Sequence, residues 1–310
     1  MAPATERGAC DIDGLRLSSG QSVRLRLDYT SQGPNGTPTY LLLHGYTGSH
    51  LALMPDPEAA DSGWASTWIG PGRVLDTRRV RILTVNLPGS SYGSNWQGAD
   101  DDYAPVVGMA SMIDSWLEAL GVQKLEGVIG YSFGGYVALA LKAWHPLRVS
   151  RALAICSASR GRGSLDELDA LQRLDSPEKR FAWRIDALSR AGLSQWAEDH
   201  GADALAREHA NVRRWSREFS AASLWRLRAA AATFELPCWP AQSTALHSSS
   251  DLLFPPPAAG ADPGCTVRTR YGHQALLLDP APWHEPIGRW VSGQLHPSSS
   301  TETRAPQESP

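Results

Sequence analysis

One serine lies in a short pattern that is suited to nucleophilic chemistry. Residues 130–134 read Gly-Tyr-Ser-Phe-Gly and place Ser132 between two glycines, with Gly135 directly after them. A G-x-S-x-G pattern that follows an apolar strand and opens a helix is typical of a sharp turn that lifts the serine oxygen clear of a sheet. The turn needs glycines because larger side chains would clash with neighbouring elements. The sequence therefore predicts that Ser132 is the nucleophile of an acyl-transfer reaction.

A serine hydroxyl attacks efficiently only when a base takes its proton, so a histidine and an acid are expected. In this strand–turn–helix context the acid and then the histidine follow the serine along the chain. Asp251 and His273 each come directly after a strand-like segment, which places both at the carboxyl edge of the expected sheet. His273 is predicted to be the general base and then the general acid, and Asp251 to orient its ring.

Other titratable residues fit these roles less well. His284 lies in a proline-rich turn, and His145 precedes a helix-ending proline. Asp279 comes after the histidine, and Asp262 lies in a Pro/Gly-rich loop with no strand before it. The remaining histidines are interpreted as loop or packing residues: His44, His50, His200, His209 and His247.

Two backbone N–H groups are needed to stabilise the oxyanion that forms during acyl transfer. One is expected from Phe133, the residue after the serine, at the N-terminus of the following helix. The other is expected from the loop that follows the strand ending at His44-Gly45, where Tyr46 is the predicted donor.

Strands and helices alternate along the chain. Strand-like apolar runs cover residues 40–43, 80–85, 127–130 and 151–156, and the pattern of strands alternating with helices resumes near residues 240–246 and 266–271. Helical patterns cover residues 109–120 and 136–144, and alternation at residues 14–29 predicts an antiparallel hairpin. Unbroken apolar strands separated by helices predict a mostly parallel sheet with helices on both faces. With the serine turn, this predicts an α/β-hydrolase fold.

Residues 161–235 differ from the rest of the chain. They are rich in Arg, Ala, Leu, Glu and Trp and contain no strand-like run, so we expect a helical lid over the carboxyl edge of the sheet. The core is then expected at residues 1–160 and 236–296. Residues 297–310 are mostly Ser, Thr, Glu and Pro, which predicts a disordered tail.

The composition of the chain limits the classes of molecule that it is expected to bind. The net charge of −3 and the absence of a basic run argue against nucleic acid or an anionic membrane. No apolar stretch reaches the roughly 18 residues that span a bilayer, and the N-terminus shows no secretory signal. Four scattered cysteines fit free thiols, so a cytoplasmic protein that acts on a small molecule is expected. No metal-ligand spacing is present, and no bound cofactor is expected.

Several longer blocks resemble the homoserine O-acetyltransferase family, whose members have the α/β-hydrolase fold. They cover residues 41–50, 63–64, 68–77, 85–94 and 250–255, together with Tyr-Gly-His at 271–273. The Gly-Pro-Gly-Arg and Asp-Thr sequences within 68–77 are rare in ordinary esterases. The resemblance implies that Ser132 takes an acetyl or similar acyl group from acetyl-CoA or a related acyl-CoA and passes it to an alcohol. It also implies a possible homodimer formed through the lid.

The chain departs from the family at the positions that meet the acceptor. Gln274 follows the histidine where the family usually has an aspartate, and Trp183 stands where it has an arginine. Arg184 is one residue further, about 100° around a helix, so it is expected to point elsewhere. Tyr136 replaces a usual methionine. These four residues are candidate substrate contacts, and the lost charges predict an acceptor other than homoserine.

Two functions share these catalytic residues. The favoured one is an O-acyltransferase, and the alternative is an esterase or thioesterase in which water deacylates the same intermediate. The two differ in whether the pocket excludes water and binds the alcohol. Lid tryptophans 183, 196, 215 and 225 are candidates to line an apolar pocket, but most of them are interpreted as helix packing. Arginines 160, 184, 213 and 214 are candidates to meet a CoA phosphate or a carboxylate, with a solvated lid face as the default interpretation.

Overall fold

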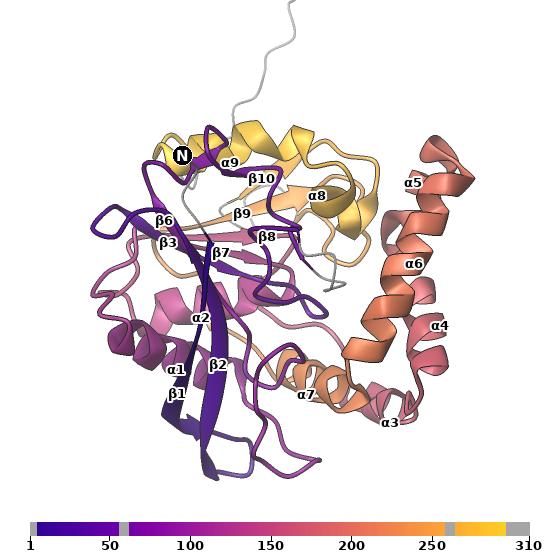
Figure 1. The fold of residues 1–310 in the computed structure, drawn as a ribbon, viewed down its shortest axis with the longest axis horizontal. Helices are drawn as coiled ribbons and strands as arrows, with labels where there is room; N and C mark the ends of the chain where they lie inside the picture. The colour runs from indigo at the N-terminus through magenta and orange to yellow at the C-terminus, as the bar shows by residue number, and fades with distance from the viewer. Residues whose placement is uncertain (1–4, 56–61, 258–263, 296–310) are drawn as a thin grey trace, which may run out of the picture.

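The computed structural model describes residues 5–55, 62–257 and 264–295, and these ranges are built around an eight-stranded sheet (Figure 1). The strand order is β1-β2-β6-β3-β7-β8-β9-β10. The β1–β2 and β2–β6 pairs are antiparallel, and the pairs from β6 to β10 are parallel. The strands are β1 (Thr5–Arg16), β2 (Ser22–Gln32), β3 (Thr39–Leu43), β6 (Arg81–Val85), β7 (Gly127–Tyr131), β8 (Ala152–Ile155), β9 (Ser243–Ser248) and β10 (Gly264–Val267).

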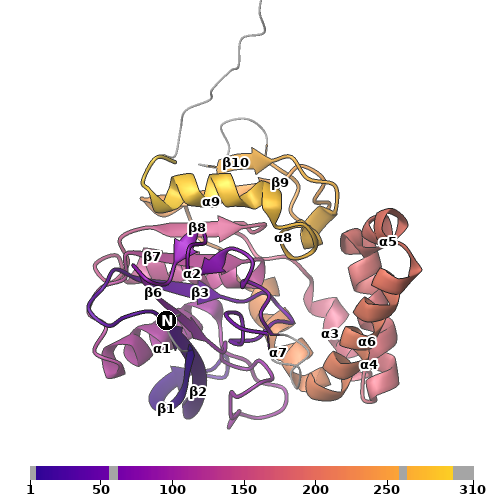
Figure 2. The ribbon, with the colours of Figure 1, turned by 45° about the horizontal axis from the view of Figure 1, so that its top comes forward.

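Helices cover both faces of the sheet, as Figure 2 shows. Successive residues of a strand point to opposite faces, so Leu41 and Leu43 of β3 belong to one core cluster and Tyr40 and Leu42 to the other. Helices α1 (Val106–Ala119) and α2 (Phe133–Trp144) pack in the first cluster, and α8 (Ala275–Leu278) and α9 (His284–Val291) in the second. Because both faces are buried, the parallel strands carry unbroken apolar runs.

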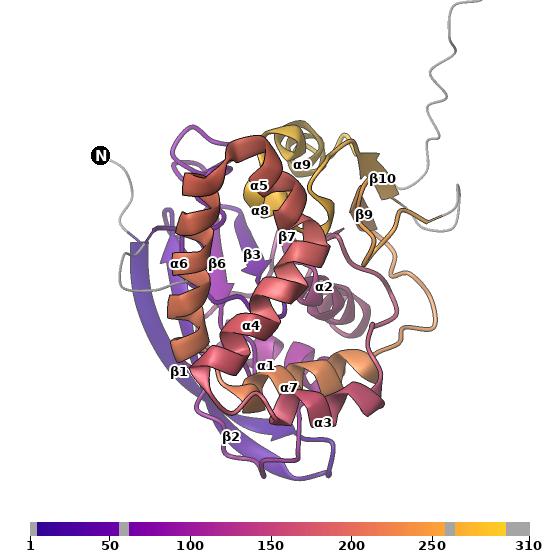
Figure 3. The same ribbon diagram turned by 90° about the vertical axis from the view of Figure 1, so that its right-hand side faces the viewer.

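Between β8 and β9 the chain forms a set of helices, which we call the helical insertion (residues 161–235). Figure 3 looks onto it, with α4 and α6 crossing in front of the sheet. Its elements are η1 (Leu165–Glu167), α3 (Leu168–Gln172), α4 (Pro177–Leu188), η2 (Ser189–Leu193), α5 (Ser194–His200), α6 (Ala202–Glu218) and α7 (Ala221–Ala232). Ser176 and Ser220 cap α4 and α7 by accepting the N–H of the residue three positions on.

The predicted α/β fold is confirmed, with local differences. The hairpin was expected to start at residue 14, but β1 begins at Thr5. No residue from Thr5 to Asp11 is buried, so this part of the strand lacks the apolar alternation of a half-buried strand. Helix α2 starts at Phe133 rather than at Tyr136, since the glycines that weaken a helical pattern are needed here for close packing. The predicted tail at 297–310 and the rejected Asp262 lie outside the described residues. No helix in the described ranges has the length and apolar character needed to cross a membrane.

Arg151 ties the C-terminal helix to the sheet. Its guanidinium donates to the Trp290 carbonyl and to the Val291 carbonyl at 2.8 Å, and it pairs with Glu126 at 3.1 Å. The guanidinium carbon also lies 4.8 Å from the centre of the Trp290 ring. The side chain is only 18% exposed, so these bonds are largely shielded from water.

We expect Arg151→Met to lower the free energy of unfolding by about 2–3 kcal/mol, because buried carbonyls lose a charged donor. Urea unfolding followed by circular dichroism measures this change. Arg24→Met, in the exposed hairpin, is the matched control and should change stability by about 0.5 kcal/mol or less. Equal effects of the two substitutions would show that Arg151 does not hold α9.

Candidate active site

The turn between β7 and α2 holds Ser132 in an unusual conformation. Its backbone angles are φ 53° and ψ −117°, a region that side-chain-bearing residues rarely adopt. A Cβ at Gly130 would lie 2.1 Å from the Gly134 carbonyl oxygen, and a Cβ at Gly134 would lie 2.4 Å from that of Leu43. The two glycines therefore let β7, α2 and the end of β3 approach closely enough to form the predicted turn.

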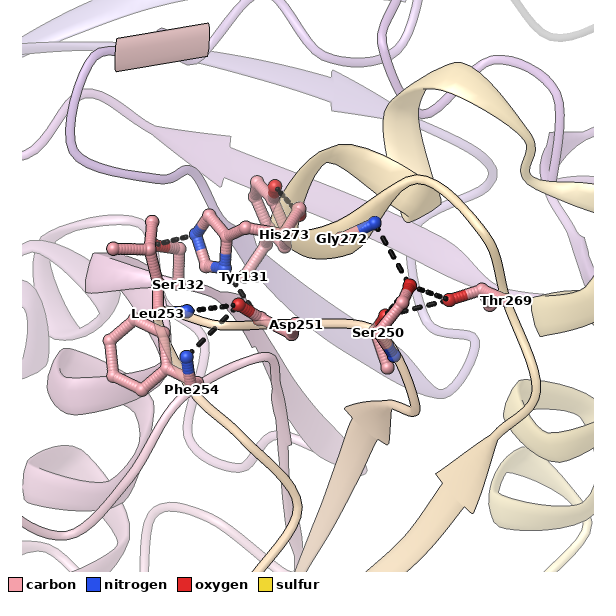
Figure 4. Close-up of polar contacts among 10 residues, drawn as sticks. Tyr131, Ser132, Ser250, Asp251, Leu253, Phe254, Thr269, Gly272 and His273 are labelled. Atoms are coloured by element: carbon pink, nitrogen blue, oxygen red, sulfur yellow. Dashed lines mark hydrogen bonds and ion pairs between the residues drawn. The ribbon is translucent and has the colours of Figure 1, made fainter. Parts of the chain in front are cut away.

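The three residues selected from the sequence form one hydrogen-bonded chain (Figure 4). His273 Nε2 lies 2.8 Å from Ser132 Oγ, and His273 Nδ1 lies 2.7 Å from Asp251 Oδ2. With Nδ1 donating to the carboxylate, Nε2 is left to accept the serine proton. All three side chains are buried, and each comes from the carboxyl end of a strand or the loop after it.

Asp251 is held as a carboxylate. Its Oδ1 accepts the backbone N–H groups of Leu253 at 2.7 Å and Phe254 at 3.0 Å. Burial by itself would raise the pKa of Asp251, but the hydrogen bond and charge of His273 and these two N–H groups outweigh burial and lower it. A charged Asp251 can stabilise the imidazolium that forms when His273 takes a proton.

The loop that carries His273 is fixed from several directions. The Tyr131 hydroxyl donates to the His273 carbonyl at 2.7 Å, and the two rings stack with centres 5.5 Å apart. The Phe254 ring centre lies 5.3 Å from that of His273. Ser250 Oγ accepts the Gly272 N–H at 3.0 Å, which joins the acid loop to the histidine loop (Figure 4). His273 itself lies in the short helix η3 (Gly272–Gln274).

The loop after β3 is held by a buried neutral histidine. His44 Nε2 accepts the Leu87 N–H at 3.1 Å, so His44 Nδ1 is protonated and donates to the Gly45 carbonyl at 2.8 Å. Because a trans peptide is planar, fixing the Gly45 carbonyl also fixes the direction of the Tyr46 N–H. Phe133 begins α2, so its N–H has no acceptor within the helix. Both predicted oxyanion donors thus lie on rigid backbone beside Ser132.

A cavity of about 890 Å³ opens onto the serine. It is lined by Ser132 and His273, by both predicted oxyanion residues, and by every predicted substrate contact: Tyr46, Phe133, Tyr136, Trp183, Arg184 and Gln274. Trp183 and Arg184 both line the cavity, and the Arg184 guanidinium carbon lies 5.1 Å from the centre of the Trp215 ring. That the two side chains point in different directions stays a prediction. The lining is largely apolar apart from a group of arginines.

The histidines rejected as the catalytic base, and three of the lid arginines, are not among the described residues that line this cavity. His145 contacts Asp114 at 3.3 Å, and His284 begins α9. Arginines 160, 213 and 214 are not among the described residues that line the cavity. Trp215 and Trp225 are buried within the helical insertion, consistent with helix packing.

One residue beside the acid was missed by sequence reasoning. Cys156 follows β8 with a positive φ of 48° and is completely buried. Burial and then the charge of Asp251 raise the pKa of this thiol well above its usual value, and the thiol hydrogen-bonds Asp251. Among the described residues, Cys156, Asp251 and His273 are grouped closely enough to share a metal ion, with ligand atoms within 4.8 Å. We interpret the group as a hydrogen-bond network, since the acid and the histidine already bond each other.

The fold and the hydrogen-bonded serine, histidine and aspartate define a protein of the α/β-hydrolase class. The family model for the alpha/beta hydrolase fold matches residues 38–259, so the chain belongs to this family.

The similar curated proteins are homoserine acyltransferases, which confirms the resemblance seen in the sequence. A homoserine O-succinyltransferase of Leptothrix cholodnii is 36% identical over 47% of this chain and 43% of its own length. One of Xanthomonas campestris is 31% identical over 71% of this chain and 54% of its own length. A homoserine O-acetyltransferase of Haloferax prahovense is 32% identical over 54% of this chain and 44% of its own length. The matched segments therefore span about half of these relatives.

Several solved structures have a fold similar to that of this chain. Esterase E22 has a TM-score of 0.77 and 15% identity, covering 93% of this chain and 100% of that chain. A homoserine O-acetyltransferase from Staphylococcus aureus has a TM-score of 0.74 and 18% identity, covering 93% and 95%.

Two buried histidines make stability depend on pH. Burial lowers the pKa of His44 and of His50 to about 4. Since an unfolded histidine titrates near 6.5, the unfolded chain binds more protons between pH 6.5 and 4, and stability falls as the pH falls through that window. Each histidine should remove about 2 kcal/mol of stability on going from pH 7.5 to pH 5.

Urea unfolding of the wild type and of His50→Gln at the two pH values tests this expectation. The variant should lose about 2 kcal/mol less than the wild type between pH 7.5 and 5, because one of the two buried titrating groups is gone. An identical loss in both proteins would contradict the depressed pKa of His50.

Proposed function

We propose that this protein is a serine-dependent O-acyltransferase that moves an acetyl or similar acyl group from an acyl-CoA to an alcohol through an acyl-Ser132 intermediate. The observation that carries the proposal is the Asp251–His273–Ser132 chain of hydrogen bonds, which opens into a large cavity beside the N-terminus of α2. The homoserine acyltransferases among the relatives support transfer to an alcohol as the outcome.

In the first half-reaction Ser132 Oγ attacks the thioester carbonyl carbon and gives its proton to His273 Nε2. The carbonyl oxygen becomes an oxyanion, which accepts the N–H groups of Tyr46 and Phe133. When the tetrahedral intermediate collapses, the carbon–sulfur bond breaks and the thiolate takes the proton from His273. Asp251 stabilises the positive ring between these two transfers.

In the second half-reaction the acceptor hydroxyl gives its proton to His273 Nε2 and attacks the acyl-enzyme. Collapse of this second intermediate breaks the bond to Ser132 Oγ, which takes the proton back. The helical insertion supports transfer over hydrolysis because its residues, among them Trp183 and Leu188, wall the cavity in which an acceptor alcohol would compete with water for the acyl-enzyme.

Homoserine itself fits the cavity poorly. An amino-acid acceptor carries an ammonium group that needs an anionic partner, but Gln274 is uncharged. Glu167 is the single acidic residue among the described residues that line the cavity, and four arginines line the cavity with it, so an ammonium group meets a net positive lining. We therefore propose an alcohol without an ammonium group as the acceptor.

Acetyl-CoA incubated with the enzyme, with and without a panel of alcohols, tests the proposal. Without an alcohol we expect about one equivalent of thiol per enzyme and an acetylated Ser132 in the mass spectrum, and we expect continued thiol release only when a suitable alcohol is present. Ser132→Ala should lower the rate on the order of 10⁴-fold or more, because the nucleophile is lost. Ser164→Ala, an exposed serine before η1, is the matched control.

Thiol release that is complete without any alcohol would instead assign the protein as a thioesterase. Turnover of Ser132→Ala near the wild-type rate would refute the nucleophile altogether.

A further inference from the structure

The cavity beside Ser132 carries an excess of positive charge. Its lining includes Arg162, Arg184, Arg190 and Arg228, against Glu167 as the single acid among the described lining residues. Arg190 already has an anionic partner that is not among the described lining residues, because it forms an ion pair with Asp186 at 2.6 Å. The remaining arginines in the cavity lining favour a ligand that brings negative charge.

The Arg228 guanidinium has a buried N–H group that is available to a ligand. Arg228 projects from α7, and its guanidinium carbon lies 4.9 Å from the centre of the Tyr46 ring. Its Nε is buried and has no hydrogen-bond partner among the described residues. Its ion pair with Glu167 is long, at 3.8 Å, and Glu167 is 56% exposed, so this partner satisfies Arg228 only weakly.

Arg162 reaches the same end of the cavity. Its backbone N–H donates to the Tyr136 hydroxyl at 3.1 Å, and its guanidinium carbon lies 5.6 Å from the centre of the Phe254 ring. The next residue, Gly163, packs so closely on α7 that a Cβ there would lie 2.7 Å from Arg228 Cδ. The segment that carries Arg162 therefore lies directly against Arg228.

The Tyr136 hydroxyl lies at the same end of the cavity as the two arginines. Burial raises the pKa of this hydroxyl, against the backbone hydrogen bond from Arg162 and the charges of Arg228 and Arg162. The hydroxyl lies beside the segment that carries Arg162, because it bonds the Arg162 N–H, and the next residue of that segment packs on Arg228. The hydroxyl accepts the Arg162 N–H, and among the described residues its own proton has no acceptor. It is therefore a neutral donor placed beside two cations.

We propose that Arg228, Arg162 and the Tyr136 hydroxyl bind an anionic group, a carboxylate or phosphate, on the substrate whose acyl carbon lies at Ser132. This inference rests on the proposed function and adds the class of substrate. Guanidinium groups and a hydroxyl donor match the oxygen acceptors of such anions, and charge-assisted bonds are strong where water is scarce.

Binding the anion would also act on catalysis. Arg228 packs on the ring of Tyr46, and the Tyr46 hydroxyl donates to the Leu224 carbonyl of the same helix at 2.6 Å. An anion held by Arg228 thus stabilises the contact between α7 and the loop that supplies an oxyanion donor. Remote binding energy of this kind raises kcat as well as lowering KM.

A matched pair of activated esters tests the site: mono-p-nitrophenyl succinate, which carries a carboxylate, and its methyl ester, which does not. The measurement is the ratio of their kcat/KM values from p-nitrophenol release. We expect the wild type to prefer the charged ester, and Arg228→Gln and Arg162→Gln each to lower the ratio about tenfold. Glu167→Gln should raise it, because a competing carboxylate is removed.

Arg213→Gln is the control, since this arginine lies on α6 over Phe181 and not among the described lining residues. It should leave the ratio unchanged. A second pair, acetyl-CoA and S-acetyl-N-acetylcysteamine, shows whether the anion is instead a phosphate of the thiol carrier. In that case the two arginine variants lower the preference in this pair and not in the ester pair.

The inference is overturned if the wild type prefers the anionic member of neither pair, or if Arg228→Gln and Arg162→Gln leave both ratios unchanged. That failure is distinct from failure of the proposed function. If turnover of the neutral ester depends on Ser132 but the charged ester is not preferred, only the anion site is refuted. If turnover survives Ser132→Ala, the acyl-enzyme mechanism is refuted.

Discussion

The backbone conformation of Ser132 is the constraint on which the rest of the site depends. A serine at φ 53° stays there only because neighbouring elements leave it no alternative. Gly134 packs on the end of β3, and a Cβ at Gly135 would lie 2.4 Å from the Ser157 side chain after β8. The turn thus fixes α2 against the ends of both strands that flank β7. The same packing sets the Phe133 N–H beside the loop of Tyr46, so one strained residue places both the predicted nucleophile and its predicted oxyanion donors.

The helical insertion takes part in this geometry through two loops. Trp215 Nε1 donates to the Thr47 carbonyl at 3.1 Å, beside the predicted oxyanion donor. Gly192 of η2 packs on the backbone before the histidine, where a Cβ would lie 2.0 Å from the Tyr271 carbonyl oxygen. Asp199 accepts the Tyr271 hydroxyl at 3.0 Å. A shift of these helices would therefore move the oxyanion loop and the histidine loop together, which links the shape of the cavity to its chemistry.

The sequence predicts the catalytic side chains better than the residues around them. Ser132, Asp251 and His273 each follow a short strand of the parallel part of the sheet, and the carboxyl ends of parallel strands meet at one edge, so local patterns suffice to bring them together. The start of β1 is harder to predict because its exposed residues hide the period. Arg228 gives no sequence signal of its own. Its direction follows from how α7 packs on the Tyr46 loop, and a helical pattern reports a buried face but not the neighbour that covers it.

The proposed proton-transfer residues and the proposed substrate-binding arginines come from different parts of the fold. Side chains that move protons come from strand ends and are shielded, so the Asp251 charge is compensated by His273 and by backbone N–H groups. The two arginines of the proposed anion site come from the helical insertion, where Arg228 and Arg162 line the same cavity as one weakly paired acid, Glu167. Since poorly solvated charges are stabilised by an opposite charge, an excess of cations in the lining favours a substrate that carries an anion. The strand ends thus carry the residues of the proposed acyl transfer, and the insertion carries the arginines that we propose select the substrate.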